Sequence, residues 1–420
     1  MLQLPAQCFR CRRRSPLLLL LLAGLLGALG LTALRRHVRQ PAEPGASRAA
    51  VRLSTSLPAP LPPPLAASAR ANDTCLLFVT RTMSLTKVRR TLFSAQQRFN
   101  GRFGHRLVVL GEQPFDAAFQ QTLRLMLGSG GSHADVAFGQ IDPADWAYPD
   151  WVDRGRARHA AADWAAAHDR DGDGADAEGR PGYRHMVRYW AAPFADHALL
   201  AGCAFVWRLE PGAHFTCDIA DDPLARMRRD RVAYAFSVAL DAEMPDAAPS
   251  LRPVARDFIS AHPELFAASA TGGSGGRGNS LAWLFADRRA GSSPFPREQC
   301  RFLTNSELVD LSFVRSAAYR KLFAFVDRLG VFYYERWSDA TVRALAVALF
   351  LPASRVLWLD HVGYRHDRLS NCPEGDERQM RCTCDPRKSA HLLPMACSAG
   401  WGNSTGPAPE ARFAMDPRLV

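Results

Sequence analysis

Short apolar runs recur along the 420-residue chain, separated by longer stretches with apolar residues at helical spacing. Runs of five to nine residues rich in Val, Leu and Phe are typical of buried strands. They predict strands at Cys75–Thr80, Arg106–Leu110, Cys203–Trp207, Val232–Leu240 and Arg355–Leu359. The helical spacing predicts helices at Ser84–Asn100, Tyr183–Leu200 with a break near Pro193, Pro253–His262 and Asn305–Leu329. The strand–helix–strand opening favours an α/β fold with a mostly parallel sheet.

One predicted strand is followed directly by residues that could bind a ligand or take part in catalysis. The run that ends at Trp207 continues as Arg208, Leu209, Glu210 and Pro211. Proline cannot donate a ladder hydrogen bond, so the strand is expected to end there. Open α/β sheets bind ligands at the carboxyl ends of their strands. Further ligand types follow within a dozen residues: Cys217, Asp218, Asp221 and Asp222. The stretch therefore predicts a metal-assisted site for an anionic ligand.

Two other charged residues have both a functional and a structural interpretation. Arg81 directly follows the first predicted strand, where a phosphate or a nucleotide can lie, and the alternative is a solvated loop cation. Glu335 lies between aromatic residues and is a candidate for catalysis. Its alternative is a structural carboxylate paired with Arg336 or Arg343. The residues alone leave both questions open.

The N-terminus predicts a membrane anchor. Residues 17–34 carry no charge and at about 1.5 Å per residue would span about 27 Å, enough for a thin bilayer. A cleaved signal peptide is the alternative, but its apolar core is usually about 7–15 residues long. We therefore expect a cytoplasmic tail at 1–16, an uncleaved span at 17–34 and a Pro- and Ala-rich stem at 35–71. A lumenal catalytic domain is expected at 72–420.

The net charge of +11 is concentrated at the N-terminus. Residues 1–40 contain seven of the 52 basic residues and no acidic one, which leaves 45 basic against 41 acidic residues beyond them. A body so close to neutral argues against nucleic-acid binding.

The cysteines indicate an oxidising compartment. Of ten cysteines, Cys8 and Cys11 precede the predicted span and eight follow it, an even number that suggests disulfides without revealing their pairing. The spacing of Cys382 and Cys384 is poor for zinc, so a metal site there is disfavoured. Asn72 and Asn403 begin N-glycosylation sequons.

Two stretches are predicted to be insertions. Asp169–Glu178 begins like an EF-hand calcium loop, but the twelfth position is Arg180 where a bidentate Glu is required, so a solvated acidic insertion is favoured. Thr271–Asn279 is glycine-rich and lacks the Lys-Ser/Thr of a phosphate-binding P-loop.

Several motifs together resemble those of the fungal Golgi α-mannosyltransferases of glycosyltransferase family 15. The motifs are YRHMVR at 183–188, WRLEP at 207–211 with the CDIADDP segment after it, FYYERWSDATV at 332–342 and DHVGYRH at 360–366. Weaker matches are TR at 80–81, IDPADWAYPDW at 141–151, the segment 300–319 and the triplet Asn371-Cys372-Pro373. The similarity extends from Asp73 to Cys397, nearly the whole predicted lumenal body.

The resemblance implies a GT-A-like nucleotide-sugar-binding fold with a mixed central sheet, in a single-pass type II protein of the Golgi membrane. It implies transfer of mannose from GDP-mannose with retention, commonly in α-1,2 links, to mannosylated O- or N-glycans or glycoproteins. The implied cofactor is a divalent metal, and carboxylate, imidazole and phosphate ligands suit Mn²⁺.

The resemblance also implies roles for individual residues. Glu210 would bind the metal, together with His391 or, as the alternative, His366. Donor contacts would come from Arg81, Tyr183 and Arg208. Glu335 would be the carboxylate beside the anomeric carbon. Retention would follow either from its attack as a nucleophile or from a same-face ion-pair mechanism, and the sequence leaves both open. Asp218, Asp221 and Asp222 become supporting residues and Cys217 a disulfide partner.

The sequence departs from the family pattern at a few positions. A usual Gly and Pro are Ser338 and Thr341, a usual Tyr is Asp221, and a usual Asp is Ala220. The resemblance therefore leaves two alternatives, a mannosyl-phosphate transferase and an inactive scaffold subunit of a mannan-synthesising complex.

Overall fold

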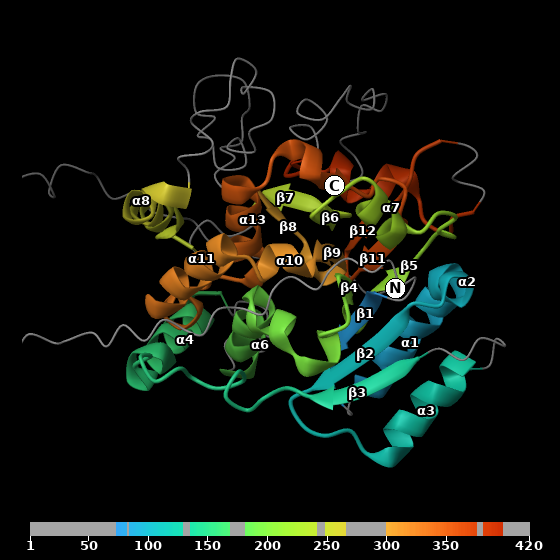
Figure 1. Ribbon diagram of the computed structural model, residues 1–420, viewed down its shortest axis with the longest axis horizontal. Helices are drawn as coiled ribbons and strands as arrows, with labels where there is room; N and C mark the ends of the chain where they lie inside the picture. The colour runs from blue at the N-terminus through green and yellow to red at the C-terminus, as the bar shows by residue number, and fades with distance from the viewer. Residues whose placement is uncertain are drawn as a thin grey trace, which may run out of the picture. The chain divides into compact units, whose positions relative to one another are not determined.

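The computed structural model describes residues 73–81, 84–128, 135–168, 181–241, 248–265, 300–375 and 381–397 (Figure 1). Its centre is a seven-stranded sheet with the strand order β10-β6-β9-β4-β1-β2-β3. The strands are β1 (Thr74–Val79), β2 (Arg106–Gly111), β3 (Val136–Gln140), β4 (Phe205–Leu209), β6 (Tyr234–Phe236), β9 (Glu307–Asp310) and β10 (Val356–Trp358). All neighbours run parallel except β9, which is antiparallel to β4 and β6. The sheet is therefore mixed, as expected.

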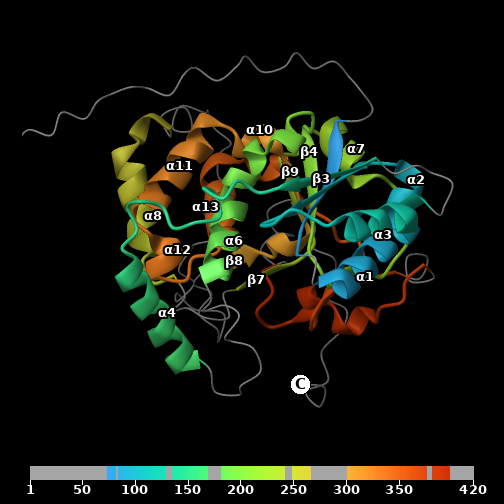
Figure 2. The same ribbon diagram turned by 90° about the horizontal axis from the view of Figure 1, so that it is seen from below.

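Alternating side chains of the strands build two cores, one on each face of the sheet. Leu76 and Phe78 of β1 belong to the core shared with α1 (Leu85–Ala95), α3 (Ala117–Gly128) and α7 (Pro223–Arg229). Cys75 and Leu77 belong to the opposite core, shared with α6 (Pro181–Ala191), α11 (Ala317–Arg328) and α13 (Asp339–Phe350). Figure 2 shows α1 and α3 apart from α6 and α13. Each large apolar side chain buried in this way contributes about 1.5–3 kcal/mol.

Smaller elements surround the central layers. The helices are α2 (Gly101–Phe103), α4 (Arg154–His168), α8 (Leu251–Ala261), α10 (Leu311–Val314) and α12 (Val331–Tyr334). A three-stranded sheet joins β12 (Leu369–Asn371), β11 (Tyr364–His366) and β5 (His214–Phe215), and β7 (Ala239–Asp241) pairs with β8 (Cys300–Phe302).

Most predicted elements are confirmed, and two needed correction. The break near Pro193 is real, because α6 gives way to short 3-10 turns at Pro193–Asp196 and Ala198–Leu200. The stretch Asn305–Leu329 is not helical throughout: its first part is β9, which lies between β4 and β6. A four-residue strand is too short to reveal itself against a helical period. Val232–Leu240 forms two strands, since β6 joins the large sheet while β7 pairs with β8.

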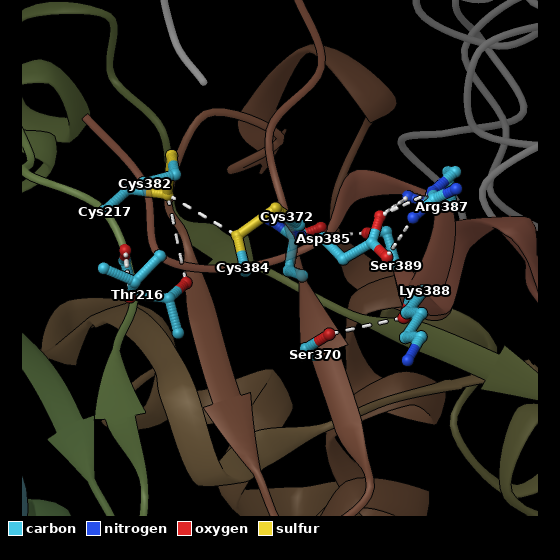
Figure 3. The surroundings of a disulfide bond; sticks show 12 residues. Thr216, Cys217, Ser370, Cys372, Cys382, Cys384, Asp385, Arg387, Lys388 and Ser389 are labelled. Atoms are coloured by element: carbon cyan, nitrogen blue, oxygen red, sulfur yellow. Dashed lines mark hydrogen bonds and ion pairs between the residues drawn. A yellow bond between two sulfur atoms is a disulfide. The ribbon is translucent and has the colours of Figure 1, made fainter. Parts of the chain in front are cut away.

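Four disulfides use all eight cysteines of the body: Cys75–Cys203, Cys217–Cys382, Cys300–Cys397 and Cys372–Cys384. Two of them adjoin, with the sulfur of Cys384 3.8 Å from that of Cys217 (Figure 3). The disulfide prediction is confirmed, including the change of Cys217 from candidate ligand to disulfide partner.

Several predictions lie outside the described residues: the anchor at 17–34, the stem, the insertions at 169–178 and 271–279, and the sequons at Asn72 and Asn403. Among the described residues, no helix combines the length and the apolar character needed to span a bilayer.

Candidate active site

The carboxyl ends of β1 and β4 lie side by side and carry the predicted site residues. Arg208 is the penultimate residue of β4, and Glu210 follows the strand. The turn after Glu210 depends on Gly212, whose φ of +97° favours glycine. Thr91 of α1 fixes this turn: its hydroxyl lies 3.3 Å from the carbonyl oxygen of Glu210 and accepts from the Gly212 N–H at 3.0 Å. The backbone of Glu210 is thereby held against the first helix.

Arg208 is buried and is contacted by three side chains. Its Nη1 donates to Oδ2 of Asp339, its Nη2 lies 3.3 Å from Oε2 of Glu210, and its guanidinium lies 3.9 Å from the centre of the Trp190 ring. Burial by itself lowers the pKa of Arg208, but the charges of Asp339 and Glu210 outweigh it and raise the pKa. Arg208 is therefore a fixed positive charge between two carboxylates.

Asp339 enters the site from the first turn of α13. Its Oδ2 also accepts a hydrogen bond of 2.7 Å from the hydroxyl of Thr304. The helix begins with a side-chain cap, in which Oγ of Ser338 accepts from the N–H of Thr341. A proline at 341 has no N–H to donate, so Ser338 and Thr341, the two departures from the family pattern, form one compatible cap.

Two cavities meet at Arg208, Glu210 and Met186. The smaller, of about 210 Å³, is lined by Arg81, Ser84, Lys87, Trp190 and neighbouring residues of β1 and β4. The larger, of about 290 Å³, is lined by Tyr183, Asp241, Arg301, Thr304, Asn305, Arg336, Asp339 and others. We call them the β1 compartment and the α13 compartment. A third and larger groove of about 970 Å³ includes Ala220 and Asp221 but none of these predicted site residues.

Tyr183 lines the α13 compartment. Burial, followed by the charges of Asp339 and Glu210, raises the pKa of its phenol to about 12. The hydroxyl therefore keeps its proton at neutral pH. Its electrostatic coupling to both carboxylates agrees with its position on the cavity wall.

Arg81 lies at the mouth of the β1 compartment. Its side chain is 58% exposed and forms an ion pair of 2.9 Å with Glu112, the residue after β2. Among the residues described, Lys87 of α1 is a second cation in the same lining. Both the functional and the solvated interpretations of Arg81 are compatible with this placement.

Glu335 lines neither compartment. Its Oε2 accepts hydrogen bonds from Oγ of Ser250 at 2.9 Å and from Nε1 of Trp337 at 3.0 Å. The pairing proposed for it with Arg343 is wrong, because Arg343 forms its carboxylate contacts with Glu307. The guanidinium of Arg336 lies 4.3 Å from the centre of the Trp164 ring.

The two candidate histidines also lie outside the linings of these compartments. His391 forms hydrogen bonds of 2.8 Å with both Ser389 and Glu374. His366 lies on β11, with Nδ1 3.3 Å from Asp367. Within the described part of the chain, the only three metal-ligating side chains that converge are Cys217, Cys382 and Cys384, and all of these are in disulfides.

Two of the three acidic residues after β5, Asp218 and Asp222, have structural contacts. Asp218 pairs with Arg98, while Asp222 caps α7 by accepting from the Leu224 N–H and lies 3.1 Å from His105. The sequence motifs assign no role to Asp339, Trp190 or Thr304. Asp339 was within reach, because it belongs to the matched segment FYYERWSDATV.

These arrangements can be compared with known proteins. A model of the glycolipid 2-alpha-mannosyltransferase family matches residues 46–406. The chain belongs to this family. The resemblance inferred from the motifs is thus confirmed, and with it the enzyme class, a mannosyltransferase.

Relatives and solved structures agree with this assignment. O-glycoside alpha-1,2-mannosyltransferase homolog 2 of Schizosaccharomyces pombe is 32% identical over 330 residues, which is 78% of this chain and 81% of the relative. Glycolipid 2-alpha-mannosyltransferase 1 of Candida albicans is 31% identical over 325 residues, covering 76% and 69% of the two chains.

Two family structures share the fold. Core-mannan synthase A of Aspergillus fumigatus, in an Mn/GDP form, has a TM-score of 0.68 at 25% identity and covers 82% of this chain and 88% of its own. The mannosyltransferase Ktr4p of Saccharomyces cerevisiae in complex with GDP has a TM-score of 0.69 at 29% identity, with coverages of 79% and 82%. The mixed α/β fold is therefore similar to that of glycosyltransferases.

Proposed function

We propose that this mannosyltransferase uses GDP-mannose and a divalent metal to add mannose, with retention, to an α-mannoside on O- or N-linked glycans, forming α-1,2 links. The observation that carries the proposal is the group Arg208, Glu210 and Asp339 where the two compartments meet. The names of the relatives supply the linkage, and the GDP complexes of two of them supply the nucleotide.

The charges of the two compartments suit the two halves of the donor. A nucleoside-diphosphate leaving group gains negative charge as the glycosidic bond breaks, and fixed cations stabilise that charge. In our proposal the β1 compartment takes the diphosphate, where Arg81 and Lys87 join Arg208 in its lining. The α13 compartment takes the mannose and the acceptor hydroxyl, with Tyr183 donating a hydrogen bond.

The oxygen atoms at this junction suit a hard divalent cation. Glu210 offers a carboxylate on the shared wall, and Oδ1 of Asn305 is buried on the α13 side without a hydrogen-bond partner among the described residues. Mn²⁺ binds such oxygen ligands together with phosphate oxygens and, where available, imidazole. When bound, the ion neutralises the charge that develops on the diphosphate. We propose Glu210 as its protein ligand, with His391, or alternatively His366, as the further ligand to be tested.

Two carboxylates are candidates for the position beside the reacting carbon, Glu335 and Asp339. The resemblance favours Glu335, and that remains a prediction. The cavity linings support Asp339 instead, because Asp339 lines the α13 compartment and Glu335 does not. Asp339 is hydrogen-bonded to Arg208 and Thr304, so its orientation is fixed before a sugar binds.

Mannosyl-phosphate transfer is the second candidate. Arg301 and Arg336 line the α13 compartment, and guanidinium groups there favour an anionic acceptor or product. An inactive scaffold is less favoured. Its sequence support was Asp221 and Ser338, but Asp221 lines a different groove and Ser338 forms a regular helix cap.

For localisation we propose a type II protein of the Golgi membrane, anchored by residues 17–34, with the stem 35–71 and the catalytic domain 72–420 in the lumen. If so, both Asn72 and Asn403 are accessible to N-glycosylation. Endoglycosidase sensitivity of the full chain in microsomes tests this. The topology would be contradicted if neither sequon were glycosylated and if added protease digested residues 72–420 in intact microsomes.

The function is tested by product analysis. Residues 72–420 are incubated with GDP-mannose, Mn²⁺ and a panel of mannoside acceptors, and the product is examined by NMR and mass spectrometry. We expect one added hexose in an α-1,2 link. A phosphate in the product would support the second candidate instead. An absence of both transfer and donor hydrolysis would support the scaffold.

A further inference from the structure

The C-terminal end of α6 is held by a buried hydrogen-bond network. The last carbonyls of a helix lack partners inside it. Here the carbonyl of Trp190 accepts from Nη2 of Arg343 at 3.1 Å, and that of Ala191 accepts from the hydroxyl of Tyr319 at 2.6 Å. Arg343 also donates to the Tyr319 hydroxyl at 2.6 Å. Two residues from α11 and α13 thus fix the backbone at Trp190.

Arg343 is itself held in place by a buried carboxylate. The side chain has no exposed surface, and its Nε and Nη2 contact the two carboxylate oxygens of Glu307 at 3.0 and 3.3 Å. A forked contact of this kind fixes the plane of the guanidinium. The position of Trp190 is therefore defined by a rigid charged pair that touches neither compartment.

The Trp190 ring connects this network to the active site. It is 3% exposed, lines the β1 compartment and lies 3.9 Å from the guanidinium of Arg208. Arg208 uses Nη1 and Nη2 for the two carboxylates, while its Nε is buried without a hydrogen-bond partner among the described residues. The face of the Trp190 ring is thus the contact that limits rotation of the Arg208 guanidinium out of its plane.

We propose that Trp190 is a positioning residue that sets the plane of Arg208 and, through the Arg208–Glu210 contact, the direction of the Glu210 carboxylate. Arg343 and Glu307 anchor it. Residues that orient a metal ligand typically change metal affinity or activity by about 10–100-fold when they are altered. This inference rests on the proposed metal role of Glu210.

The test measures Mn²⁺ affinity directly, from the free-ion electron paramagnetic resonance signal, for residues 72–420 with saturating GDP. Trp190→Met fills space without an aromatic face, and Trp190→Phe keeps a smaller one. Trp207→Met is the matched control, because Trp207 is fully buried on β4 next to Arg208 but faces the opposite core. Glu210→Gln reports on the metal site itself. Thermal unfolding is recorded for every variant.

We expect Trp190→Met to raise the Kd for Mn²⁺ by about tenfold and Trp190→Phe by about threefold, with Trp207→Met within about twofold of the unchanged chain. If Trp190→Met does not fold, the proposal is tested by Trp190→Phe, whose Kd for Mn²⁺ should rise about threefold while that of Trp207→Phe stays unchanged. A loss of thermal stability with unchanged Kd overturns the positioning role. If Glu210→Gln binds Mn²⁺ as well as the unchanged chain, the proposed metal site fails as well.

Discussion

Arg208 of β4 and Asp339 of α13 form an ion pair in which the two side chains are only 5% and 6% exposed, although 131 residues separate them in sequence. The pair joins the central sheet to the helix that closes the α13 compartment. A buried charge is tolerated only when it is paired and hydrogen-bonded, and here Glu210 and Thr304 complete the arrangement. The same four residues therefore hold the fold together and shape the proposed donor site.

Removing the carboxylate charge of Asp339 breaks this pair and leaves the buried guanidinium of Arg208 with the partly exposed Glu210 as its remaining contact to a carboxylate among the described residues. We expect Asp339→Asn to destabilise the domain by about 3–5 kcal/mol. Transfer should fall by at least about 100-fold, because misplacing a binding group by about 1 Å has that effect. Denaturant unfolding measures the loss of stability, and initial rates measure the loss of transfer.

The exposed pair Arg229–Asp230 is the matched control for Asp339→Asn, and Asp230→Asn should leave the free energy of unfolding nearly unchanged. In the double variant Arg208→Met/Asp339→Leu we expect stability to recover while activity does not. Recovered transfer in that variant would show that the pair has only a structural role.

Arg81 is expected to bind nucleotide without contributing to the fold. Its ion pair with Glu112 is largely solvated, so Arg81→Ala should change the free energy of unfolding by less than about 1 kcal/mol. The Kd for GDP, measured by calorimetry, should rise by about 10- to 150-fold, since a charge-assisted phosphate contact contributes about 1.5–3 kcal/mol. Arg229→Ala is the exposed-arginine control. An unchanged Kd for Arg81→Ala would favour the solvated interpretation.

His185 makes stability depend on pH. Burial, followed by the charge of Arg188, lowers its pKa to about 4, from 6.5 in the free side chain. Between about pH 4 and 6.5, His185 is therefore protonated in the unfolded chain and neutral in the folded chain. This contribution to stability is complete above about pH 6.5 and is lost as the pH falls towards 4.

Between pH 7 and 5 the expected loss of stability from His185 is about 1–2 kcal/mol, after allowance for solvent screening. His185→Gln removes the titration while keeping a polar group beside Tyr333. We expect a flatter pH dependence of the unfolding free energy for this variant. Equal pH dependence for the two proteins would show that His185 is not the group responsible.

Glu335 can be tested against its structural neighbours. Since its Oε2 accepts from Ser250 and Trp337 outside the cavity linings, a glutamine oxygen can accept the same bonds. We expect Glu335→Gln to retain transfer within about tenfold and Ser250→Ala to behave similarly. A fall in kcat of about 1,000-fold in Glu335→Gln alone, with normal unfolding, would restore the nucleophile role implied by the resemblance.

The sequence predicted the position of Arg208 and Glu210 because a strand ending at a proline is a local pattern. It did not predict Asp339 as their partner, since that contact depends on how α13 packs on the sheet. β9 was missed for a related reason: its four residues become a strand only between β4 and β6. The even number of cysteines implied disulfides, but their pairing required the fold.

The proposed metal site is tested most directly by comparing mannose transfer by the unchanged domain and by Glu210→Gln as Mn²⁺ is titrated after chelation. We expect transfer from GDP-mannose to require the metal, and Glu210→Gln to lower the rate at least about 100-fold while unfolding normally. Full activity of Glu210→Gln, or of the unchanged domain without a divalent ion, would contradict this proposal.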